Sequence, residues 1–71
     1  MNTQLELKQN IDDFGSFYDM LGEAHAGLDE DQRGIVDAQL ILLLANHIGD
    51  MAVLRQAFGL ARRKLDIILS N

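Results

Sequence analysis

Residues 29–50 read DEDQRGIVDAQLILLLANHIGD and contain the most clearly bounded helix signal in the chain. Asp29 stands at the N-cap position and Gln32 follows three residues later, which is the pattern of a capping box. Gly49 suits the left-handed turn that commonly ends a helix. The stretch therefore predicts a helix over residues 30–48.

The corner after this helix has several polar residues with separate expected roles. Gly49 turns the chain, and Asp50 caps a third helix over residues 51–69 with almost no loop between the two helices. The amide of Asn46 or the imidazole of His47 is placed to satisfy carbonyls left open at the helix end. We expect the corner to pack the two helices as neighbours. A partner-recognition spot on this rigid corner is the alternative interpretation.

A first helix is expected over residues 13–26, before the stretch quoted above. Asp12 or Asp13 can cap its start. Apolar side chains then recur at intervals of three and four residues, which is typical of one helix face. Gly27 suits the left-handed position just beyond the helix end.

The composition agrees with a single small helical domain. The chain has 71 residues, 48% of them hydrophobic, with no proline and no cysteine. Residues 1–11 carry few apolar anchors and are predicted to be a flexible arm, and residues 12–71 form one helical domain. The predicted fold class is all-α, a three-helix bundle over approximately residues 13–26, 30–48 and 51–69.

The apolar pattern predicts association. Helix 30–48 is apolar on two sides, so both sides must be covered. The third helix adds a second apolar stripe at heptad spacing, and a chain this short without disulfides rarely buries enough surface alone. We therefore expect a homodimer that completes the bundle, with an obligate protein partner as the alternative. The predicted interaction surface comprises Val36, Leu40, Leu43, Leu44, His47, Val53, Leu60 and Ile67.

Charge is distributed unevenly along the chain. The net charge is −5 overall, which argues against sequence-independent binding to nucleic-acid phosphates. Residues 1–50 carry ten acidic side chains against Lys8 and Arg33, a net −8, whereas four bases against Asp66 give residues 51–71 a net +3. This asymmetry can match the acidic first helix of one subunit to the basic third helix of another. A nucleic-acid-binding regulator that uses helix 51–69 is the alternative function.

The titratable residues do not form a convincing catalytic or metal site. His25 and His47 are interpreted as structural, since about 25 Å separates the two ends of one helical hairpin. Asp19 and Glu23, one turn apart, are interpreted as an exposed acidic face rather than a cation site. No catalytic, cofactor-binding or metal residues are therefore predicted. A ligand or metal site at a dimer interface around His47 remains the alternative.

Several functional classes lack their sequence signals. There is no nucleophile elbow, phosphate-binding glycine loop or dinucleotide fingerprint, so we expect no enzyme activity. The longest apolar run is the six residues 40–45, too short to span a membrane. The N-terminus has no hydrophobic signal core, and the expected location is the cytoplasm.

Two segments resemble a known family. Residues 42–50, LLLANHIGD, preceded by residues 23–28, EAHAGL, resemble a family of short bacterial proteins classed as a domain of unknown function. The resemblance covers roughly residues 13–65. Such proteins are often encoded beside flavin-dependent aromatic hydroxylases, so the resemblance implies a small accessory subunit and no catalytic or cofactor residues. The predicted function is a non-catalytic helical interaction module, a homodimeric accessory or regulatory subunit of a bacterial enzyme system.

Overall fold

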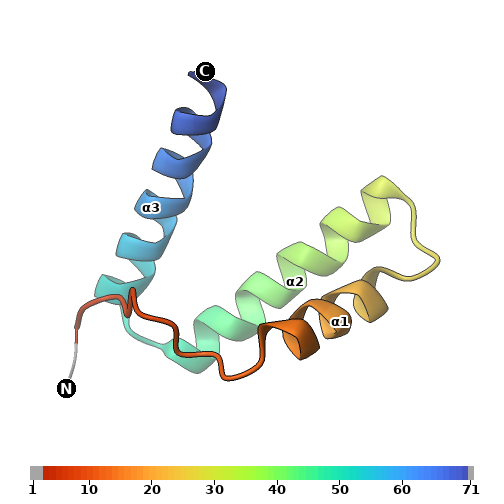
Figure 1. Cartoon of the computed structure of the whole chain (residues 1–71), viewed down its shortest axis with the longest axis horizontal. Coiled ribbons are helices and arrows are strands. Elements are labelled where there is room, and N and C mark those ends of the chain that lie inside the picture. Colours follow the sequence, from red (N-terminus) through yellow and green to blue (C-terminus); the bar gives the residue numbers. More distant parts are fainter. Residues whose placement is uncertain (1–2, 71) are drawn as a thin grey trace.

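The computed structural model describes residues 3–70, and this part of the chain is all-α (Figure 1). The predicted fold class is confirmed, and each helix agrees with its predicted range within one residue at either end. In chain order the three helices are α1 (Phe14–His25), α2 (Glu30–Ile48) and α3 (Met51–Leu69).

Helix α1 is bounded by an acidic cap and a left-handed glycine. Of the two predicted caps, Asp13 is the one used, and its carboxylate accepts from the Ser16 amide at 2.9 Å and the Ser16 hydroxyl at 2.7 Å. The hydrogen bond from the Ser16 amide, and then that from its hydroxyl, hold the pKa of Asp13 below its ordinary value of 3.8. Beyond the helix, Gly27 has φ of 75°, as predicted.

Helix α2 begins at the capping box that the sequence predicts. The backbone amide of Gln32 donates to the Asp29 carboxylate at 2.9 Å. In return, the backbone amide of Asp29 donates to the side-chain oxygen of Gln32 at 3.1 Å. The helix ends at Gly49, whose φ of 72° lies in the left-handed region. The Gly49 amide donates to the carbonyl of Ala45 at 2.8 Å. Both ends of α2 are thus fixed by local hydrogen bonds.

The corner between α2 and α3 differs from the sequence expectation in two respects. The backbone amide of Gly49 satisfies the helix end, and neither Asn46 nor His47 makes a side-chain hydrogen bond within residues 3–70. The helices also diverge after the corner instead of packing as neighbours (Figure 1). Asp50 accepts from the Ala52 amide at 2.9 Å and starts α3 immediately, and the backbone angles of Gly49 and Asp50 set the direction in which α3 leaves α2.

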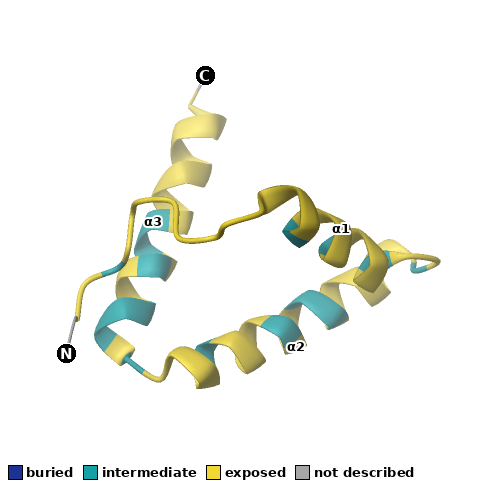
Figure 2. Cartoon of the chain, turned by 60° about the horizontal axis from the view of Figure 1, so that its bottom comes forward, coloured by how far each residue is buried: buried dark blue, intermediate teal, exposed yellow. Residues whose placement is uncertain are grey.

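The three helices therefore form an open arrangement. Helices α1 and α2 form an antiparallel hairpin, and α3 projects from its far end (Figure 1). The radius of gyration is 14.2 Å, against about 11 Å for a compact chain of this length. None of the described residues is fully buried, and the half-buried ones lie where α1 faces α2 and along the first half of α3 (Figure 2).

The N-terminal arm lies against α3. Residues 3–13 contain no helix, and they run from the base of α3 to the start of α1 (Figure 1). The side chain of Gln56 on α3 makes two hydrogen bonds to the arm. Its Oε1 accepts from the Leu5 backbone amide at 3.1 Å, and its Nε2 donates to the Thr3 carbonyl at 2.9 Å. The flexibility predicted for residues 1–11 stays a prediction, and residues 1 and 2 lie outside the described residues.

We predict opposite effects from alanine at two glycines. Gly49→Ala should destabilise the fold by about 1 kcal/mol, because an L side chain is strained at a positive φ. Gly22→Ala should stabilise α1 by about 1 kcal/mol, since a Cβ there meets no atom within 4 Å. Urea unfolding followed by circular dichroism at one fixed protein concentration measures both. A Gly49→Ala variant as stable as the parent would contradict the assigned turn.

Candidate functional site

The first hollow on the surface lies between α1 and α2. It has a volume of about 330 Å³ and is lined entirely by apolar side chains. The lining residues come from the facing stripes of the two helices, where positions three and four residues apart share one side. They are Phe17, Met20, Leu21, Ala24, Leu40 and Leu44.

A second apolar hollow lies inside the angle between α2 and α3. Ile41 of α2 and Ala57, Phe58 and Ala61 of α3 line a volume of about 220 Å³. Ile41 and Leu44 are three residues apart on α2 and therefore lie on neighbouring parts of its surface, so the two hollows adjoin. We call the residues that line both hollows the concave face.

The structure divides the interaction surface that the sequence predicts. Leu40 and Leu44 line the first hollow, whereas Leu60 is half-buried and faces the N-terminal arm. Leu43 and Ile67 lie outside both hollows, with 69% and 65% of their surface exposed. The three remaining predicted residues also lie outside the hollows, Val36 and Val53 half-buried and His47 exposed.

Sequence reasoning missed several members of the concave face. Met20 and Phe58 are not among the residues of the predicted interaction surface, and the side chain of each is more than half exposed. Ile41 lies within the predicted helix 30–48 but is not among the residues of the predicted interaction surface. The signal was present in the two-sided apolar pattern of α2, but the direction of α3 was needed to show which side becomes concave.

His25 has a partner that the sequence did not reveal. Its Nε2 atom lies 2.6 Å from Oδ1 of Asp37, which joins the end of α1 to α2. A carboxylate only accepts, so the imidazole donates. The hydroxyls of Ser16 and Ser70 are engaged elsewhere, with Asp13 and with the Ile67 carbonyl. The contact therefore links α1 to α2, and neither serine hydroxyl takes part in it.

The predicted polar positions elsewhere form no cluster. His47 and Asn46 are exposed beside the α2–α3 corner. Among residues 3–70, no group of three or more histidine, aspartate or glutamate side chains is arranged to hold a metal ion. No helix in the same range is long and apolar enough to cross a bilayer.

The charges of the hairpin and of α3 are mostly unpaired. Within the described chain, Arg62 Nε lies 3.4 Å from Asp66 Oδ1 in an exposed ion pair, and Asp37 contacts His25. Exposed Asp19 and Glu23 on α1 have no basic partner, and neither do exposed Arg63 and Lys64 on α3. The chain thus presents unpaired acids on one arm of the angle and unpaired bases on the other.

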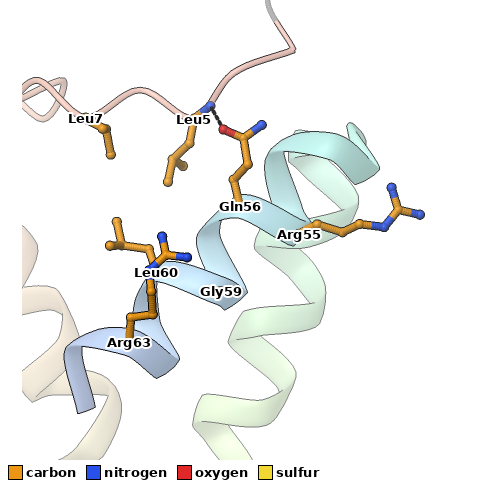
Figure 3. Close-up of a pocket in the computed structure, with 7 residues that line it drawn as sticks. All are labelled: Leu5, Leu7, Arg55, Gln56, Gly59, Leu60 and Arg63. Carbon is orange, nitrogen blue, oxygen red and sulfur yellow. Dashed lines mark hydrogen bonds between the residues drawn. The ribbon is translucent and has the colours of Figure 1, made fainter. Parts of the chain in front are cut away.

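A third hollow lies beneath the N-terminal arm (Figure 3). Leu5 and Leu7 of the arm lie over Leu60 of α3, and Gln56 holds the Leu5 amide. The volume is about 240 Å³. The Arg55 side chain points away from the arm, so the lining arginines do not converge on one point (Figure 3). The hollow accordingly resembles a packing contact between the arm and α3 more than a ligand site.

Comparison with known proteins identifies a family without assigning an activity. A family model described as "Protein of unknown function (DUF2783)" matches residues 3–63, most of the chain. No curated protein and no solved structure matches the chain.

We predict that the His25–Asp37 contact stabilises the hairpin measurably. A double-mutant cycle with His25→Ala and Asp37→Ala should give a coupling energy of about 1 kcal/mol, because a half-buried charge-assisted hydrogen bond is lost. A cycle on Arg62 and Asp66 is the matched control, and this exposed pair should couple by less than about 0.5 kcal/mol. Both are measured by urea unfolding. Equal coupling energies in the two cycles would contradict a specific stabilising role for the His25–Asp37 contact.

Proposed function

The chain belongs to the DUF2783 family of proteins of unknown function, and we propose that it is a non-catalytic interaction module that acts as a homodimer. In this role it serves as an accessory or regulatory subunit of a bacterial enzyme system. The proposal rests chiefly on the accessible surface of the single chain.

That surface is too large for an independent monomer. It measures 6418 Å², against about 4400 Å² for a compact monomer of this mass. Much of the excess is apolar, because seventeen large hydrophobic side chains among residues 3–70 are exposed. Soluble monomers rarely expose extended apolar surface, and a patch of this kind usually marks an interface.

A second copy is a sufficient partner for this surface. If each of two chains buried the excess of roughly 2000 Å², the interface would reach about 4000 Å² in total, within the range of obligate homodimers. Twofold dimers are the commonest closed assemblies. Association would also offset the ordering entropy that a short chain without disulfides has difficulty meeting.

The accessory role draws on the resemblance to short bacterial proteins encoded beside flavin-dependent hydroxylases. A dimer of two small helical chains offers a rigid surface for binding a larger protein. The nucleic-acid alternative gains less support, since Arg62 already pairs with Asp66 and helix 51–69 has a single aromatic side chain, Phe58, which lines the concave face.

We predict a concentration-independent dimer in the micromolar range. Light scattering across a dilution series should give a mass near twice 7.9 kDa, because the chain cannot cover its apolar faces alone. Circular dichroism on the same samples should show that helicity is retained while the dimer persists. A mass of one chain with full helicity at every concentration would overturn the proposal.

A further inference from the structure

The second half of α3 is the part of the molecule least supported by its own chain. All residues from 61 to 70 are exposed, and this segment projects into solvent away from the hairpin (Figures 1 and 2). Leu65 and Ile68, three residues apart on one side of the helix, remain 46% and 68% exposed. An apolar helix face of this kind needs a cover.

The concave face offers a cover of matching character. Its two adjoining hollows are lined by apolar side chains and run from α1 across α2 to α3. An amphipathic helix binds such a groove through side chains spaced three and four residues apart. The spacing of Leu65, Ile68 and Leu69 meets this requirement.

The charges favour the same pairing. The hairpin of residues 14–48 has six acidic side chains against Arg33 alone, a net −5, whereas residues 51–71 have a net +3. Glu23 lies three residues from Met20 of the first hollow, on the same side of α1, and has no basic partner. On α3, Lys64 lies four residues from Ile68 on the same side and has no acidic partner, whereas Arg63 lies with Leu60 against the N-terminal arm. An unpaired acid and an unpaired base therefore border the two apolar surfaces.

We infer that the second half of α3 docks on the concave face of a second copy of the chain, which returns the same contact. This inference rests on the proposed homodimer and specifies its interface. Each chain's α3 then packs against its partner's α1–α2 hairpin, and the exchange closes a symmetric dimer. The occupant is a second copy because the corner at Gly49 and Asp50 directs α3 away from its own hairpin.

Single cysteines test this contact directly, because the natural chain contains none. Met20→Cys places a thiol in the first hollow, and Ile68→Cys places one on the projecting helix. Mixed and oxidised, the two variants should form a covalent heterodimer in at least about fivefold excess over either homodimer. Leu42→Cys is the matched control: Leu42 is 69% exposed, as Met20 is 67% exposed, but lies outside both hollows. It should not cross-link preferentially to Ile68→Cys.

Three cross-linking patterns would overturn the inferred contact. They are self-pairing of Ile68→Cys in preference to Met20→Cys, equal cross-linking to Leu42→Cys, and an internal disulfide in a monomeric Met20→Cys/Ile68→Cys chain. Failure to form any mixed disulfide while light scattering still shows a dimer also overturns it. A parent chain that is monomeric by light scattering would instead overturn the proposed function.

Charge reversal gives a second, independent test. Glu23→Lys and Lys64→Glu should each weaken self-association by about fivefold at low salt. A mixture of the two variants restores opposite charges at both contacts of the exchanged dimer, so it should assemble as heterodimers with near-parental affinity. The dissociation constants are measured by sedimentation equilibrium. A mixture no tighter than either variant alone would contradict the pairing of these two surfaces.

Discussion

The left-handed turn at Gly49 decides where α3 points, and hence which apolar faces the chain leaves open. Its φ of 72° ends α2, and the Asp50 cap starts α3 in the next residue. The backbone angles of these two residues set the direction in which α3 leaves the hairpin. The concave face, the projecting half of α3 and the large accessible surface all follow from this one short connection.

The hairpin is held by a different balance of forces. Local caps define the ends of α1 and α2, but no described side chain is fully buried between them. The hydrogen bond between His25 and Asp37 therefore matters more than usual for the relative position of α1 and α2, because it is directional and the apolar packing between them is loose. A small domain gains most of its stability from buried apolar area. The single chain has the apolar side chains for such a core, but its three helices are not arranged so that they bury these side chains.

The parts of the fold that were predictable from sequence are those governed by neighbouring residues. Asp29 with Gln32, Gly49 and Asp50 each act within three or four positions, so the helix limits could be located closely. The angle after the corner was not predictable, because a two-residue connection allows several directions. The His25–Asp37 contact and the hydrogen bonds of Gln56 to the arm join residues 12 and more than 50 positions apart. Such contacts depend on the assembled backbone, and this explains why the predicted interaction surface divides among separate regions.

Under the proposed exchange, apolar surface and charge perform separate tasks. Burial of the exposed leucines and isoleucines supplies most of the association energy but is non-directional, so it cannot by itself select one register. The acidic hairpin and basic α3 supply direction, since a parallel contact between two α3 helices would place like charges together. The same α3 face cannot cover its own hairpin and the partner's hairpin at once. Because the rigid corner disfavours the first arrangement, folding and association become one coupled process, and stability depends on the concentration of the chain.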